Sequence, residues 1–409
     1  MINLNHCKIH FFMLKYVCFI QIKKNRTQTI MLKKDVLEIR KQFSHENCCI
    51  TRICGCYVDA EKEKRLEFKE GFLSLPEEET FKYFELFKQT LSGTVGKNLI
   101  PLEFPLTQEG AGGTQEFLLS LRNSKLQDDL LLNEFYDKII EHYDFGEHYL
   151  ILLIHATYDI PGKSSDGTKM FDASDEVYEH ILCSICPVAR SKAGLCYNSQ
   201  DNVIEGRFRD WLVGVPAKGF LFPTFSDRTA NIHEVLYFSK KPEELMESFI
   251  ENLFGSSIPL TASTQKETFH SIISDTLGET CSYEVVKNLH ENLNKLLEEN
   301  KEAEEPLKLN KPDIKRLLEK SGADEERLEI FEQEFDSITA EDTTLLASNI
   351  ANTKKFDIQT PNVAIHVNPD FTDLIETKII DGRPCLVIPV DSQIEVNGLY
   401  VKIDPLEKQ

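Results

Sequence analysis

The cysteines give this 409-residue chain its clearest capacity for chemistry, because thiolates are preferred zinc ligands. Cys183 and Cys186, with His180 and Cys196 nearby, are the best candidates for a metal site. However, the run 177–188 has the apolar character of a strand, and residues three apart on a strand point to opposite faces. A second group lacks the usual spacing of a zinc knuckle: Cys48, Cys49, Cys54 and Cys56. We therefore expect buried free thiols, with no metal and no other cofactor.

Two groups of ionisable residues could form a site in the loops of the central sheet. The first group is Asp227, Arg228 and His233, and the second is Arg207, Arg209 and Asp210 beside the only tryptophan, Trp211. Polar loop residues held by a rigid sheet often bind or catalyse. They also serve as turn caps and surface ion pairs, which is the more ordinary interpretation. An enzyme would require these groups to converge on one pocket.

Established catalytic and phosphate-binding motifs are missing from the sequence. There is no Gly-x-Ser-x-Gly elbow and no His-Glu-x-x-His pair. Gly162, Lys163 and Ser164 are similar to the end of a P-loop, but Thr157 stands where the first glycine is required. The glycine-rich loop 110–113 is flanked by acidic residues, which oppose an anion. We therefore favour a non-catalytic protein and keep an enzyme of unknown type, or an interaction scaffold, as alternatives.

Charge separates the first 30 residues from the rest. The chain has 46 basic and 67 acidic residues and a net charge of −21. Residues 1–30 contain five of the basic residues and no acidic one, so the remainder has a net charge of −26. Such a chain repels nucleic acids and anionic membranes, and contact with DNA would need a local basic patch or a partner that supplies one.

The segment 1–30 is apolar but does not have the pattern of a membrane anchor. Lys8, Lys15 and Lys23 interrupt it, which leaves no run near the roughly 18 residues that a span needs. It also lacks a small-residue cleavage site. We predict that 1–30 is an extension or follows a mis-chosen start codon, and that the functional protein is 31–409, cytoplasmic, with reduced thiols and no membrane contact.

The apolar periodicity predicts an α+β fold. An N-terminal, largely helical part follows a cysteine-rich strand, with the strand at 50–58 and helices from Ser74 to Gly93, 114–126 and 128–142. A central, mostly antiparallel sheet is built on a ribbon of two strands, 149–158 and 177–188, with further strands at 219–225 and 232–239. A helical region follows at 242–255, 261–278, 283–299, 313–320 and 325–335.

The C-terminal part alternates in the manner of a β-meander between 356 and 403. Asp381-Gly382 and Asn397-Gly398 are strong signals for tight hairpin turns. The charged segment 298–305 is the best linker candidate. We therefore divide the chain into an extension, a main α+β domain, a helical segment and a C-terminal meander, at 1–30, 31–300, 306–352 and 353–409.

Five sequence runs together resemble one bacterial family that is known as a domain of unknown function. They are Asp35–Arg40, Ile53–Val58, Ile154–Lys163, Ile181–Pro187 and Leu345–Thr353. The resemblance covers about 31–403 and starts at Met31. It implies family membership but no activity and no catalytic residue.

The order of the elements is also similar to that of bacterial nucleoid-associated proteins of the NdpA type. In both, a helical part precedes a central ribbon like 149–158 and 177–188, and a short helix ending like 249–255 leads into a segment like 260–265. Both close with β-hairpins. This resemblance implies a location at the nucleoid and nucleoid DNA or a DNA-bound protein as partner, and leaves a homo-oligomer open.

Overall fold

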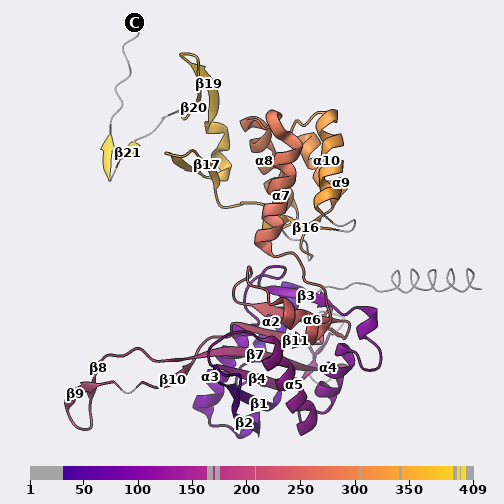
Figure 1. Cartoon of the computed structure of the whole chain (residues 1–409), viewed down its shortest axis with the longest axis vertical. Helices are drawn as coiled ribbons and strands as arrows, with labels where there is room; N and C mark the ends of the chain where they lie inside the picture. Colours follow the sequence, from indigo (N-terminus) through magenta and orange to yellow (C-terminus); the bar gives the residue numbers. More distant parts are fainter. Residues whose placement is uncertain are drawn as a thin grey trace, which may run out of the picture. The chain divides into compact units, whose positions relative to one another are not determined.

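The chain divides after Thr261 into two compact units (Figure 1). The computed structural model describes residues 31–163, 169–170, 176–207, 209–301, 303, 305–339, 343–389, 394–396 and 398–401. The sequence analysis extended the main domain to residue 300, whereas the structure groups the helices after Thr261 with the second unit. The predicted extension 1–30 lies outside the described residues.

An antiparallel sheet of eight strands is the centre of the first unit. The order is β2-β1-β4-β7-β11-β14-β3, with β10 pairing to β7 in addition. The strands are β1 (Ile50–Val58), β2 (Lys64–Gly71), β3 (Leu99–Glu103), β4 (Tyr149–Ile160), β7 (Glu176–Arg190), β10 (Trp211–Val213), β11 (Lys218–Phe222) and β14 (Glu234–Ser239). The predicted ribbon is confirmed: β4 and β7 pair along their whole common length, from Tyr149–Pro187 to Ile160–Glu176.

Helices cover both faces of this sheet, which explains why β4 and β7 are apolar almost without interruption. On one face, Leu153 and Ile185 join the core of α4 (Thr114–Asn123), α5 (Asp129–His142) and α6 (Glu247–Phe254). On the other face, Leu152 and Leu182 join the core of α2 (Lys33–Lys41) and α3 (Glu77–Thr90). The α+β class is therefore confirmed, with a two-sided core.

The start of α3 differs from the prediction. Ser74 does not cap this helix: it ends a 3₁₀ turn (Phe72–Ser74), and its hydroxyl donates to the carbonyl of Gly71 at 2.6 Å. Pro76 takes the N-cap position, and three glutamates fill the first turn of α3. Proline has no N–H to satisfy there and the carboxylates face the positive end of the helix dipole, so the helix starts without a side-chain cap.

The N-terminal part also contains two strands that the sequence did not reveal, β2 and β3. Both lie at the edges of the sheet. β2 reads Lys-Arg-Leu-Glu-Phe-Lys-Glu-Gly and is mostly exposed, which is typical of an edge strand protected by charge. Small hairpins complete the first unit: β5 (Gly162–Lys163) with β6 (Lys169–Met170), β8 (Leu195–Asn198) with β9 (Val203–Gly206), and β12 (Thr224–Ser226) with β13 (Thr229–Asn231).

Four helices make the core of the second unit. They are α7 (Ala262–Leu277), α8 (Tyr283–Glu299), α9 (Lys311–Lys320) and α10 (Glu325–Ile338). Ser282, Asn310 and Asp324 cap the last three by accepting backbone N–H groups. The predicted linker 298–305 joins α8 to α9, which lie in the same unit. A short strand pair, β15 (Lys308–Leu309) with β16 (Leu345–Leu346), and α11 (Ala347–Ile350) close this core.

The C-terminal strands form three separate hairpins rather than one continuous meander. They are β17 (Phe356–Gln359) with β18 (Ala364–Val367), β19 (Glu376–Ile380) with β20 (Arg383–Val387), and β21 (Ile394–Val396) with β22 (Leu399–Val401). The turn at Asp381-Gly382 is confirmed, with φ of 48° and 73° at the two positions as a type I′ turn requires. Gly398 has φ of 83°, and residue 397 lies outside the described residues.

Candidate functional site

The predicted pair Asp227 and Arg228 forms the tight turn between β12 and β13, with positive φ at both residues. Arg228 makes an ion pair with Glu38 of α2 at 3.3 Å and donates to the carbonyl of Pro161. The hydroxyl of Tyr158 donates to the same Glu38 carboxylate at 2.9 Å. Arg228 therefore ties α2 to the end of β4, which is a structural role.

His233 has a different partner. Its Nδ1 lies 2.9 Å from Oε1 of Glu109, whose side chain is largely buried. Glu109 precedes the glycine-rich loop before α4, so this contact holds the loop against the start of β14. His233 and Arg228 thus stabilise two neighbouring loops, and each makes its own carboxylate contact.

Arg207 and Asp210 lie at the other end of β7. Their backbones pair with residues of the opposite chain segment: the N–H of Arg207 donates to Gly194, and the carbonyl of Asp210 accepts from Ser191, both at 2.8 Å. Arg228 contacts Pro161, which is next to the first residues of β7, whereas Arg207 and Asp210 lie beyond the last residue of β7. The length of this strand, from the rise per residue, therefore separates Arg228 from Arg207 and Asp210 by roughly 45 Å. The five predicted residues therefore do not converge on one pocket.

The cysteine pair in β7 has the geometry that a strand imposes. Cys183 packs in the core on the face of α4, α5 and α6, and Cys186 packs in the core on the face of α2 and α3. Burial raises the pKa of both thiols, that of Cys186 to about 12. Within the described ranges, no group of three or more His, Cys, Asp or Glu side chains could hold a metal ion.

A two-stranded arm extends β7 beyond the sheet, and we define it as residues 188–215 (Figure 1). At its base, β10 pairs with the last three residues of β7. At its tip, β8 and β9 form a hairpin that projects away from the sheet in Figure 1. Trp211 fastens the base, because its ring lies 4.3 Å from that of His148 and 4.9 Å from the guanidinium of Arg190.

The arm carries four exposed cationic side chains. They are Arg190, Lys192, Arg207 and Arg209. In the part of the chain that the structure describes, none of them makes an ion pair with a carboxylate, although acidic residues outnumber basic ones in this protein. Arg209 instead donates from Nε to the carbonyl of Ser191 at 3.1 Å. None of the four charges is therefore neutralised by a carboxylate among the described residues, although Arg190 also lies over the ring of Trp211.

The hairpin at the tip has one exposed apolar face. Leu195, Tyr197 and Ile204 share one face, since Tyr197 pairs with Ile204 and Leu195 is two residues before Tyr197. Their exposed fractions are 78%, 60% and 64%. The opposite face is mixed: Asn198 donates to Glu205 there at 2.9 Å, beside Cys196 and Val203. An apolar face this exposed marks an interaction surface.

Comparison with family models decides the membership that the five sequence runs suggested. The model of a domain of unknown function, DUF4317, matches residues 31–399. The chain belongs to the DUF4317 family. The match includes the arm and most of both units. Neither the curated proteins nor the solved structures contain a match to this chain.

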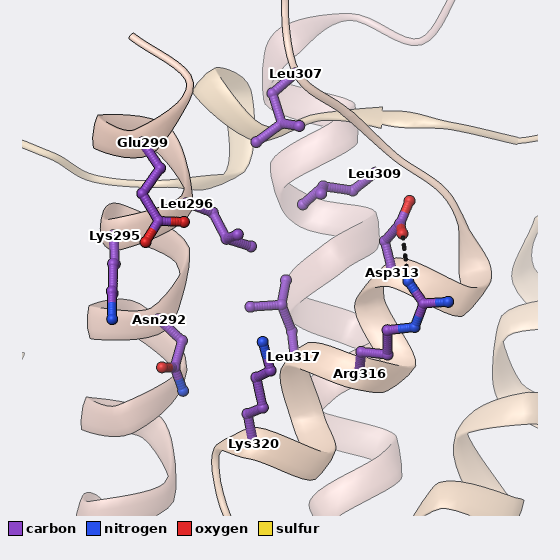
Figure 2. Close-up of a pocket in the computed structure, with 10 residues that line it drawn as sticks. All are labelled: Asn292, Lys295, Leu296, Glu299, Leu307, Leu309, Asp313, Arg316, Leu317 and Lys320. Carbon is purple, nitrogen blue, oxygen red and sulfur yellow. Dashed lines mark ion pairs between the residues drawn. The ribbon is translucent and has the colours of Figure 1, made fainter.

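The second unit of this DUF4317 chain contains a cavity of about 590 Å³ between α8 and α9 (Figure 2). Leucines line its apolar side: Leu296, Leu307, Leu309 and Leu317. Asp313 and Arg316 form an ion pair at 3.7 Å on its rim. No residue that the sequence proposed for chemistry lines it. An interaction scaffold would be indicated by a large exposed apolar patch on the helical pair 313–335. The apolar side chains of α9 and α10 are mostly buried, and an exposed apolar face lies on the arm instead.

Sequence reasoning placed Arg207, Arg209, Asp210 and Trp211 in one cluster but did not recognise the arm. The available signal was the alternation of Leu195 and Tyr197 before a polar turn and the apolar pair Val203 and Ile204 after it, which is consistent with a hairpin. This signal is short, and nothing in it indicates that β7 continues into the arm.

Among the helices of the described residues of this DUF4317 chain, none combines the length and the hydropathy that a membrane span requires.

Proposed function

We propose that this protein is a non-catalytic bacterial nucleoid-associated protein of the cytoplasm that contacts DNA through the arm. The observation that carries the proposal is the set of four exposed cations on the arm without ion-pair partners among the described residues: Arg190, Lys192, Arg207 and Arg209. They outnumber the three exposed acidic side chains of the arm, Asp201, Glu205 and Asp210, and supply the local positive charge that an acidic chain needs to approach a phosphate backbone.

The shape of the arm suits this partner. A two-stranded ribbon fits the major groove of B-DNA, and architectural proteins combine basic residues with apolar side chains that wedge between base pairs. The cations lie along the shaft of the arm, and Leu195, Tyr197 and Ile204 lie on its tip. The shaft would neutralise phosphates while the apolar face enters a groove.

The acidity of the remainder limits how DNA can approach. The chain has a net charge of −21, so the potential around both units repels a duplex, and only a projecting element avoids that repulsion. With four phosphate contacts at most, log Kobs should fall against log salt with a slope no steeper than about −3.6. Binding is therefore expected to be weak and salt-dependent.

The placement of the predicted loop residues supports a non-catalytic role. An enzyme that used them would need Asp227, Arg228, His233, Arg207 and Asp210 around one substrate. The strand β7 separates them into two groups, and Arg228 and His233 each have a structural carboxylate contact.

A salt titration with the full chain and a fluorescent duplex tests the proposal. Neutralising the arm with the quadruple substitution Arg190→Gln, Lys192→Gln, Arg207→Gln and Arg209→Gln should reduce affinity at low salt at least tenfold and flatten the slope. Replacing the apolar tip with Leu195→Ser and Ile204→Ser should reduce affinity at an unchanged slope, because no phosphate contact is lost.

The matched control removes four exposed lysines outside the arm: Lys82, Lys97, Lys301 and Lys354, each to Gln. This variant loses the same charge and should bind at least as well as the parent, provided that only the arm contacts DNA. Absence of binding by the parent at low salt, alone or with lysate partners, would overturn the proposal. Equal losses in the arm variant and the control would also overturn it.

A further inference from the structure

A buried lysine beside a cavity in the first unit has no part in the proposed function. Lys218 is the first residue of β11, and only 7% of its surface is exposed. Its ammonium donates to Oγ of Ser239 at 2.8 Å and to the backbone carbonyl of Glu244. Both acceptors are neutral. Among the described residues, no carboxylate forms an ion pair with Lys218.

The hydrogen bonds of this buried ammonium leave part of its binding capacity unused. The ammonium has three donors and a full charge, and its two neutral acceptors leave one donor unused, while the carboxylate of Glu244 acts on it electrostatically without forming an ion pair. The carboxylate of Glu244 lies at the surface, where it pairs with Lys241 at 2.7 Å. Burial accordingly lowers the pKa of Lys218 to about 8. The site lacks a buried anion.

The cavity that Lys218 lines can hold such an anion. Its volume is about 450 Å³, within the usual range for small-molecule sites. Most of its lining is apolar or aromatic: Tyr143, Phe145, Pro187, Val215, Leu245 and Met246. Lys240 adds a second, exposed ammonium at the wall. The one acidic side chain that opposes an anion here besides Glu244 is Asp144, and it pairs with Lys62 at 3.7 Å.

We propose that this cavity binds a small organic acid, whose carboxylate pairs with Lys218 and whose apolar body lies against Phe145, Val215 and Leu245. One buried ammonium matches one negative charge, and the two other lysines that line the cavity, Lys240 and Lys241, are exposed. The apolar lining selects a hydrocarbon or aromatic body over a polar one. The ligand class is therefore an apolar monocarboxylate.

Calorimetric titration of the full chain with 3-phenylpropionate tests this inference. The amide of the same acid and inorganic phosphate serve as comparison ligands. We expect 3-phenylpropionate to bind at least tenfold more tightly than the amide, which has the same body without the charge, and we expect phosphate not to compete. Equal affinity for acid and amide, or full competition by phosphate, would overturn the proposal.

Two variants locate the binding. Lys218→Met removes the ammonium and keeps an unbranched side chain, and it should lose at least tenfold in affinity for the acid and little for the amide. Val215→Trp fills part of the cavity from its exposed rim and keeps Lys218, and it should weaken the binding of both ligands. The test therefore does not depend on the folding of Lys218→Met. Lys82→Gln is the control for the loss of one positive charge. Unchanged binding of the acid by either cavity variant would refute the site, and none of these measurements involves DNA.

Discussion

The strand β7 passes through two different environments. From Tyr178 to Cys186 nearly every side chain is buried between helices on both faces, whereas most side chains of the arm beyond Val188 are exposed. The buried half gains its stability from apolar contacts, and the arm gains little. The sequence of the arm is therefore free to serve a partner, while that of the buried half must serve the fold.

The largest expected effect is in the buried half of β7. Leu182 is fully buried and packs on the face of α2 and α3. Leu182→Ala should lower the free energy of unfolding by about 2 to 5 kcal/mol, because it leaves a cavity in a two-sided core. Urea denaturation followed by circular dichroism measures this loss. A loss below about 1 kcal/mol would contradict the contrast between the two halves.

A buried cation should behave differently from the exposed cations of the arm. The folded pKa of Lys218 is about 8, below the ordinary value of 10.5, so between these values the unfolded chain binds more protons and the parent gains stability as pH rises. Relative to Lys218→Met, the parent should gain on the order of 2 kcal/mol from pH 7.5 to pH 10.

Urea denaturation of both proteins across this range provides the measurement. Thiols and phenols that titrate at high pH are present in both and cancel in the difference. Lys240, Lys241 and Glu244 face the same site and are also unchanged. A difference between parent and variant that stays constant from pH 7.5 to pH 10 would show that Lys218 does not titrate as described.

The turn at Gly382 should have a smaller and local effect. Gly382 has φ of 73°, and Val at this position would be strained by on the order of 1 to 3 kcal/mol. Because β19 and β20 pair only with each other, Gly382→Val should open this hairpin to protease while α7 to α10 stay protected. Gly398 has φ of 83°, so Gly398→Val should likewise open the hairpin of β21 and β22 to protease. Digestion patterns identical to the parent would contradict the turn assignment.

The smallest effect is expected at the tip of the arm. Leu195 has an exposed fraction of 78%, so Leu195→Ser should change the free energy of unfolding by less than about 0.5 kcal/mol. Urea denaturation followed by circular dichroism measures this change, as for Leu182→Ala. If Leu195→Ser destabilised the protein by more than about 1 kcal/mol, the apolar face would already be covered within the protein, and its role as a docking surface would be lost.

The buried elements could be predicted from sequence because their patterns are long. The strand at 50–58 and the helix at 283–299 have the predicted ends, and the ribbon of β4 and β7 was evident from its two apolar runs. The edge strand β2 could not be found, since its charged residues hide the alternation. Ser74 failed as a cap because the chain forms a separate 3₁₀ turn before Pro76.

The candidate sites were harder to predict, because they depend on distance and burial. Asp210 and Asp227 are close in sequence, yet they lie near opposite ends of β7, which is roughly 45 Å long. Lys218 begins an apolar run, and nothing in its neighbours reveals that its ammonium lies inside the protein. Both features come from tertiary packing, for which the sequence has no local signal.

The continuity of β7 has a mechanical consequence. A pull on the arm is directed along the strand axis, so it loads in shear the whole ladder between β4 and β7, from Tyr149–Pro187 to Ile160–Glu176, and β11 resists on the other side. Hydrogen bonds loaded in shear must fail together, whereas a strand that is peeled from its end loses them one by one. We therefore expect the sheet to resist a force that is applied to the arm along the axis of β7, because the ladders to β4 and β11 would have to break together.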